Sequence, residues 1–123
     1  MQFGYNKYEK LKSRKLIKQL FEDGKAISVF PLRLVYLKTN HDGKYLLQTG
    51  VSVSKRNFKL AVDRNRIKRM MREVYRLNKA KFYNSISEKY IFMFIYLGKK
   101  EMDYHKLDKK MNELIDSFLN KNS

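Results

Sequence analysis

The stretch RNRIKRMMREVYR, residues 64–76, places six arginines and lysines among thirteen positions and spaces its apolar residues as a helix does. At about 100° of rotation per residue, one side of this helix is apolar and carries Ile67, Met70, Met71, Val74 and Leu77. The opposite side is cationic and carries Asn65, Lys68, Arg69, Arg72, Arg76 and Lys79, with Arg64 and Arg66 at its two edges. The spacing therefore predicts an amphipathic helix that docks on the rest of the fold through its apolar stripe.

The segment around this helix is rich in positive charge. Between residues 55 and 81 eleven lysines and arginines face two acids, Asp63 and Glu73, so the segment carries a net charge of +9 (11 − 2). A solvated surface helix is the alternative interpretation, but such helices usually mix the two signs so that residues four apart can pair. Like charges at this density repel one another, and a bound polyanion offsets the repulsion. On the helix itself arginine outnumbers lysine, which favours forked contacts with phosphate groups.

The whole chain shows the same imbalance. Its 123 residues include 28 Lys and Arg against 12 Asp and Glu, which gives a formal net charge of +16 and a pI of about 10.0. Nucleic acid is the first candidate partner and an anionic membrane surface the second. Because 43% of the residues are hydrophobic, the chain has enough apolar material to fold and is not a disordered basic tail.

Length and composition predict a single domain over residues 1–123, with residues 1–10 and 120–123 flexible. The chain has no cysteine, which excludes disulfides and thiolate metal sites and fits a reducing compartment. Its longest apolar run, residues 90–97, is far shorter than the roughly 20 residues that span a bilayer, and its first ten residues contain no apolar signal core. A soluble protein of the cytoplasm is the expected class.

The first half of the chain predicts one helix and three strands. Ser13 can cap a helix that Gly24 ends. Pro31 separates a short strand near residues 26–29 from a longer one at 32–38. The turn TNHDGK that follows suits a hairpin, with residues 45–53 as the returning strand.

The second half predicts the basic helix, a buried strand at 90–97 and a last helix that opens near Asp103. The element order is therefore helix, strand, strand, strand, helix, strand, helix (α-β-β-β-α-β-α). This order predicts an α+β sandwich in which helices pack on one sheet of roughly four strands.

The kind of nucleic acid follows from what accompanies the basic helix. Recognition helices for DNA usually sit in a helix-turn-helix or zinc-finger context, and the sequence has neither a second short helix after a tight turn nor a Cys/His set. Recognition of RNA by shape and stacking is therefore preferred. Four aromatic residues could stack on unpaired bases, although core packing is the commoner role for each taken alone: Phe21, Phe30, Tyr36 and Phe58.

Chemistry by the chain itself is not expected. Hydrolysis of a phosphodiester by a protein requires carboxylates gathered around metal ions, and the acids of this sequence are scattered. His41 in the turn and His105 in the last helix are interpreted as solvated side chains, because no nucleophile accompanies either. We therefore predict no catalytic residue, no protein-bound metal ion and no small-molecule substrate.

A longer run around the basic helix carries a family resemblance. Residues 50–76, GVSVSKRNFKLAVDRNRIKRMMREVYR, resemble the signature of the bacterial ribonuclease P protein subunit, with its RNR motif at Arg64, Asn65 and Arg66. The segments LIKQLFEDG (16–24) and LRLVY (32–36), the late hydrophobic strand and the closing amphipathic helix match that family in order and spacing. The resemblance thus covers nearly the whole chain.

The resemblance implies a non-catalytic protein subunit of a ribonucleoprotein endoribonuclease that removes the 5′ leader from precursor tRNA. The implied partners are the catalytic RNA of ribonuclease P and precursor tRNA, with no membrane partner. The implied cofactor is Mg²⁺, held mainly by the RNA subunit and the substrate. The family fold also contains an unusual left-handed crossover between parallel strands around the RNR helix.

Two sets of site residues follow from the resemblance. The implied contacts to the catalytic RNA are Arg64, Asn65, Arg66, Lys68, Arg69, Arg72 and Arg76. The implied contacts to the leader, in a cleft between the first helix and one sheet face, are Ile17, Phe21, Tyr36, Lys55, Arg56 and Phe58. The chain departs from many relatives at Ile17, where they carry an aromatic residue, and in the loop 55–60, which lacks a glycine.

Three alternatives remain open at this level. A general RNA-binding or ribosome-associated protein would use the same helix without a substrate cleft. A peripheral membrane protein would need the apolar stripe to face lipid, and its Met, Ile and Val residues make a weak anchor. A protein-only nuclease is disfavoured by the scattered carboxylates.

Overall fold

The computed structural model describes residues 9–122. Four helices and one four-stranded sheet follow one another as α1 (Arg14–Asp23), β1 (Lys25–Val29), β2 (Leu32–Lys38), β3 (Leu47–Val53), α2 (Ala61–Asn78), α3 (Ala80–Tyr83), β4 (Tyr90–Tyr96) and α4 (Tyr104–Lys121). The predicted α+β class and element order are confirmed, with the short α3 added after α2. Residues 1–8 and 123, on which much of the predicted flexibility falls, lie outside the described residues.

The local signals that set the element ends act as expected. The Ser13 hydroxyl accepts a hydrogen bond from the backbone N–H of Leu16 at 3.2 Å, which caps α1. At Gly24 an added Cβ would lie 2.3 Å from the Leu20 carbonyl oxygen, so the chain turns into β1 where only glycine fits. The Asp103 carboxylate accepts from the N–H groups of His105 and Lys106 and caps α4.

The sheet order β1-β2-β4-β3 corrects one prediction. The expected hairpin between residues 32–38 and 45–53 is wrong, because β4 lies between β2 and β3. β2 pairs with β4 antiparallel, and β3 pairs with β4 in parallel. A turn sequence marks where the chain reverses but not which strand becomes the neighbour. The strand Tyr90–Tyr96 is apolar throughout and buried at six of its seven positions, so it is most stable at the centre of the sheet.

The loop between β2 and β3 is held by His41, which the sequence analysis expected to be solvated. The imidazole is only 4% exposed, with Nε2 3.0 Å from the Leu46 carbonyl oxygen. The backbone N–H of Gly43 donates to Nδ1 at 3.0 Å, and the Lys89 ammonium donates to the carbonyls of His41 and Gly43. His41 therefore has a structural role in the turn.

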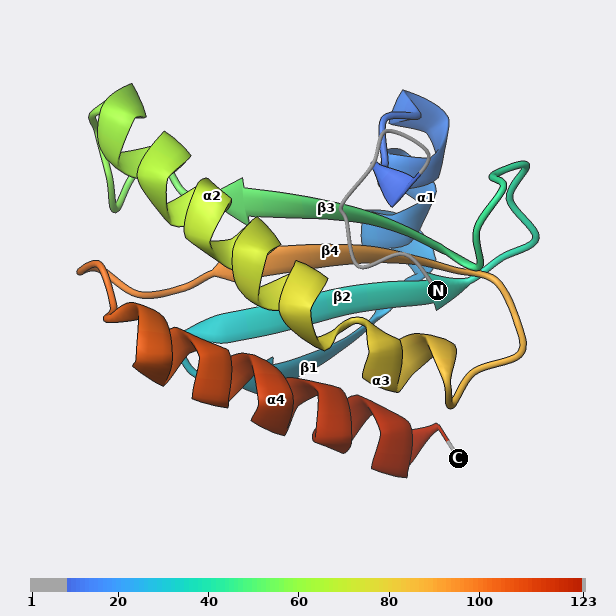
Figure 1. Cartoon of the computed structure of the whole chain (residues 1–123). Helices are drawn as coiled ribbons and strands as arrows, with labels where there is room; N and C mark the ends of the chain where they lie inside the picture. The colour runs from blue at the N-terminus through green and yellow to red at the C-terminus, as the bar shows by residue number, and fades with distance from the viewer. Residues whose placement is uncertain (1–8, 123) are drawn as a thin grey trace.

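The connection from β3 through α2 to β4 is a left-handed crossover. In Figure 1 both parallel strands point to the left, β4 lies below β3, and α2 passes in front of them. Most crossovers of this kind are right-handed. The handedness agrees with the one that the family resemblance implies.

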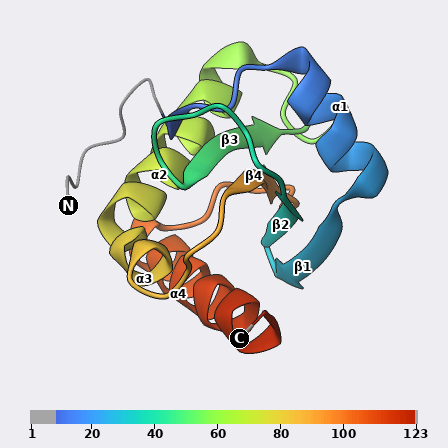
Figure 2. The same cartoon turned by 90° about the vertical axis from the view of Figure 1, so that its right-hand side faces the viewer.

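The two faces of the sheet are covered differently. Figure 2 shows α2 and α4 on one side of the sheet and α1 on the other. The larger core cluster lies under α2 and α4 and includes Phe92, Phe94 and Phe118, all fully buried. The smaller cluster lies under α1 and comprises Leu11, Leu20, Val35, Ile91 and Met93.

The apolar stripe of α2 docks on the sheet nearly as predicted. Ile67, Met71 and Val74 are buried, but Leu77 is 49% exposed and Tyr75 is buried against Phe94, with ring centroids 5.5 Å apart. Measured from Ile67, Tyr75 and Leu77 lie about 80° to opposite sides of the stripe. Helical spacing alone therefore predicts the same burial for both residues, but the sheet covers only the side of the helix on which Tyr75 lies. No helix within residues 9–122 is long and apolar enough to cross a membrane.

The prediction that Lys79 lies on the cationic side of α2 is wrong. Its ammonium forms an ion pair with the Glu9 carboxylate, and the two side chains are 3% and 1% exposed. The Tyr83 hydroxyl donates to the same carboxylate at 3.3 Å. The pair fastens the chain segment before α1 to the end of α2, and a carboxylate so far away in sequence could not be foreseen from spacing.

Candidate RNA-binding surface

The first turn of α2 is joined to the loop that precedes it. The Arg64 guanidinium donates from Nη1 to the carbonyl oxygens of Phe58 at 2.8 Å and Lys59 at 3.0 Å. The Phe58 ring is partly buried and packs on Tyr96, with centroids 6.0 Å apart. These contacts fix the loop 54–60, and Lys55 and Arg56 are exposed in it.

Arg66 is held by two carboxylates. Its Nε donates to Glu101 Oε1 at 2.9 Å and Oε2 at 3.0 Å, and its Nη2 donates to Asp63 Oδ1 at 2.9 Å. The hydrogen bond and the charge of Glu101 raise the pKa of Arg66. The guanidinium carries five N–H donors, so those that do not face a carboxylate can still bind a phosphate.

The next turns of α2 carry cations that differ from Arg66 in how they are paired. Within the part of the chain that the structure describes, Lys68, Arg69 and Arg72 have no hydrogen-bonded or ion-paired side-chain partner. Arg76 donates from Nε to Glu73 Oε2 at 3.1 Å, and this hydrogen bond lowers the pKa of Glu73. Asn65 is exposed at the start of this surface.

A shallow hollow of about 220 Å³ lies between these arginines and the chain before α1, lined by Lys10, Arg69, Arg72, Glu73 and Arg76. Its lining carries four positive charges and one negative. Lys10 was absent from the predicted site, because it lies far from α2 in the sequence. All seven residues predicted to bind the catalytic RNA lie on α2, and we call their exposed side, together with Lys10, the α2 surface.

The second candidate surface is the sheet face that α1 covers only in part. α1 packs Leu16, Ile17 and Leu20 on Val35, Ile91 and Met93. Beyond α1 a row of cross-strand neighbours runs from Ser28 through Arg33 and Ile95 to Ser52, and each of them is exposed or half-buried. Phe21 is 54% exposed on α1. This open face, with Phe21 and Ile17, is here called the α1 face.

Tyr36 does not lie on the α1 face, so its predicted position is wrong. The side chain is 3% exposed on the other side of the sheet, where its ring meets Phe118 edge-on at 4.9 Å. Successive residues of a strand point to opposite faces, and in β2 the residue that turns toward α1 is Val35. A tyrosine buried in this way cannot stack on a base. Phe58 is partly buried and packs against the core, so Phe21 is the exposed aromatic residue among the predicted leader contacts.

The structure also bears on the membrane and nuclease alternatives. The apolar stripe of α2 is occupied by the core and is not free to face lipid. Among residues 9–122 no group of three or more His, Asp or Glu side chains could hold a metal ion. The arrangement suits binding of a polyanion by α2 and of an extended strand along the α1 face.

Comparison with known proteins identifies the family of the chain. A family model described as Ribonuclease P matches residues 5–119. The ribonuclease P protein component of Porphyromonas gingivalis is 38% identical over 115 residues, which cover 90% of this chain and 83% of that protein. The corresponding protein of Geotalea uraniireducens is 31% identical over 119 residues, covering 94% and 95%.

Solved structures show the same fold. The ribonuclease P protein of Thermotoga maritima superposes with a TM-score of 0.69 at 24% identity, covering 87% of this chain and 94% of that chain. The Staphylococcus aureus protein gives a TM-score of 0.67 at 20% identity, covering 88% and 93%. These findings support a ribonuclease P subunit over a general RNA-binding protein. The chain belongs to the ribonuclease P protein family, the protein component of a ribonucleoprotein endoribonuclease.

Proposed function

We propose that the α2 surface binds the catalytic RNA of ribonuclease P and that the α1 face binds the 5′ leader of precursor tRNA. The single observation that supports this division is the cationic side of α2, on which Lys68, Arg69 and Arg72 extend without protein partners among the described residues. Phosphates that bind these groups release condensed counterions from the RNA, which favours the complex. The chain then acts by holding two RNAs in register.

The contribution to cleavage is electrostatic and positional. Two RNAs brought together repel each other, and a protein with a net charge of +16 reduces that repulsion. Fixing the leader along the α1 face limits the orientations of the scissile phosphate, which raises the rate without any protein group taking part in the chemistry.

Mg²⁺ is assigned to the catalytic RNA and its substrate. The described residues offer no cluster of carboxylate or imidazole ligands that fits the ion. We place the complex in the cytoplasm, where precursor tRNA is made in a bacterium. A lower requirement for Mg²⁺ in the presence of the protein follows from its positive charge.

The proposal is tested by cleavage of a precursor tRNA with a bacterial ribonuclease P RNA at low Mg²⁺. We expect cleavage at the mature 5′ end that depends on both components. A variant with Arg69→Glu and Arg72→Glu should lose this stimulation, whereas Lys109→Glu together with Lys121→Glu, the same charge change at exposed positions of α4, should keep most of it. Equal losses in both variants would mean that net charge, and not the α2 surface, carries the effect.

A further inference from the structure

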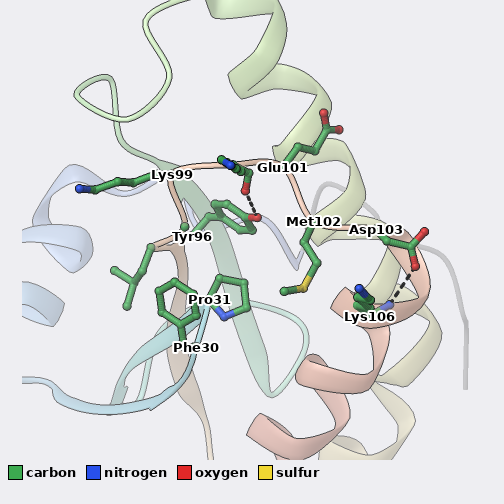
Figure 3. A pocket seen from close by; sticks show the side chains of 11 residues that line it. Phe30, Pro31, Tyr96, Lys99, Glu101, Met102, Asp103 and Lys106 are labelled. Atoms are coloured by element: carbon green, nitrogen blue, oxygen red, sulfur yellow. Dashed lines mark hydrogen bonds between the residues drawn. The ribbon is translucent and has the colours of Figure 1, made fainter.

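A pocket of about 560 Å³ lies at the end of the sheet where β4 leads to α4, next to the start of the α2 surface but not part of it. Phe30 and Pro31 come from the turn between β1 and β2, and Tyr96 and Met102 from the end of β4 and the segment that leads to α4 (Figure 3). Such a volume falls within the range of pockets that hold small organic ligands. Phe30, Pro31, Tyr96 and Met102 give it apolar walls, and lysines lie beside them.

The back wall of this pocket is already fixed. Tyr96 is 2% exposed, and its hydroxyl donates to the Lys100 carbonyl oxygen at 2.5 Å, which folds the segment after β4 over the ring. A Cβ added at Gly98 would lie 2.9 Å from the Tyr96 ring, so the backbone passes close to it. The Phe58 ring, in the loop before α2, packs on the Tyr96 ring. Little ordering is therefore required when a ligand enters.

Phe30 stands out at the opening of the pocket. Its side chain is 67% exposed, the highest value among the large exposed hydrophobic side chains of residues 9–122. It contributes little to the core, and its ring is free to stack. Base–aromatic stacking is a common source of affinity for unpaired nucleotides.

The charged groups around the pocket favour an anion. Lys99, Lys100 and Lys106 line it, are exposed, and have no ion-paired partner in the described part of the chain. The two carboxylates nearby are engaged, because Glu101 binds Arg66 and Asp103 caps α4. Three free ammonium groups beside an exposed ring match the phosphate and base of one nucleotide.

We propose that this pocket receives one unpaired nucleotide of the catalytic RNA, with its base on Phe30 and its phosphates near Lys99, Lys100 and Lys106. The catalytic RNA is the expected source because Arg66 of the α2 surface donates a hydrogen bond to Glu101 of the pocket lining, so the pocket adjoins the start of that surface. The inference rests on the proposed function, in which α2 binds that RNA. It adds a contact that holds a single base, beside the contacts that α2 makes to phosphates.

The first test compares two variants of Phe30 in binding to a bacterial ribonuclease P RNA. Phe30→Leu keeps an apolar side chain but removes the ring, and should weaken binding about 5- to 50-fold, as loss of one stacked base does. Phe30→Tyr keeps the ring and should bind within about twofold of the original protein. Both should unfold at the same temperature as the original, since the side chain is exposed. Equal affinity of all three proteins would overturn the inference.

A second test identifies the source of the nucleotide. A photoreactive phenylalanine analogue at position 30 should crosslink to an unpaired nucleotide of the catalytic RNA in the assembled complex. A crosslink to the precursor leader alone, or to neither RNA, would overturn the proposal. Arg69→Glu separates this failure from failure of the proposed function: if it weakens RNA binding while Phe30→Leu does not, only the pocket inference fails.

Discussion

Arg66 on α2 and Glu101 before α4 form a two-oxygen contact, with Nε 2.9 and 3.0 Å from the carboxylate oxygens. The two residues are 35 positions apart, so the contact links the RNR motif to the segment between β4 and α4. Arg69, one turn later, has no such partner among the described residues. The two arginines should therefore respond differently to substitution.

Arg69→Glu should weaken binding of the catalytic RNA about 10-fold or more and leave stability nearly unchanged. The Arg69 side chain is exposed and makes no hydrogen bond or ion pair with residues 9–122, so the change removes mainly the interaction with phosphate. Affinity measured over a range of salt concentrations should show a slope reduced by about one charge per lost contact. A lower unfolding temperature for this variant would contradict the assignment.

Glu101→Gln should strengthen binding of the catalytic RNA by a factor of about 2 to 5. The change removes a negative charge beside the expected phosphates and frees the Arg66 guanidinium. Arg66→Glu is a poorer probe than Arg69→Glu, because it sets a third carboxylate against Asp63 and Glu101 and should also lower stability. Weaker RNA binding by Glu101→Gln would show that Glu101 orients Arg66 for its ligand.

Phe21→Ala should weaken binding of precursor tRNA that carries a leader, by about 5-fold or more, and spare binding of the catalytic RNA. Phe21 is half exposed on α1 and makes little core contact. Mature tRNA without a leader provides the control and should bind both proteins equally.

Tyr36→Ala should instead destabilise the fold by about 3 to 5 kcal/mol, because it opens a cavity beside Phe118.

Lys79→Met should lower the free energy of unfolding by about 3 to 5 kcal/mol, since it leaves the buried Glu9 carboxylate without its cation. Urea denaturation measures the loss. Glu9→Gln combined with Lys79→Met removes both charges and should recover part of it. A loss for the double variant as large as the sum of the two single losses would mean that the pair contributes no coupling.

Burial and the nearby Glu9 carboxylate raise the pKa of the Tyr83 hydroxyl well above its ordinary value of 10.0. Because the folded pKa is the higher one, the associated stability is complete below about pH 10 and is lost as the pH rises toward the folded pKa. Tyr83→Phe has no proton to lose. The free energy of unfolding should therefore fall less steeply above pH 10 in this variant than in the original protein, and parallel curves would contradict the prediction.

The sequence predicted the elements far better than their arrangement. Ser13, Gly24 and Asp103 act through groups within a few residues, so the helix ends could be foreseen. The place of β4 between β2 and β3 depends on competition among whole strands, which a turn at Asp42 and Gly43 does not reveal.

The candidate site shows the same limit. The cationic side of α2 follows from helical spacing, and six of its predicted cations lie there. Tyr36 was assigned to the leader from the family resemblance, and because β2 is apolar on both faces its sequence did not show that residue 36 faces the core. Lys79 pairs with Glu9, and Arg66 pairs with Glu101. These partners lie far apart in the sequence, so only the folded structure brings them together.

The central claim, that α2 and the α1 face bind different RNAs, can be tested directly because the chain has no cysteine. An iron chelate attached to Asn65→Cys on α2 or to Ser28→Cys on the α1 face generates hydroxyl radicals that cut nearby RNA in the assembled complex. We predict that position 65 directs cuts to the catalytic RNA and position 28 directs cuts to the leader of precursor tRNA. Cuts in the same RNA from both positions, or the reverse pattern, would contradict the account.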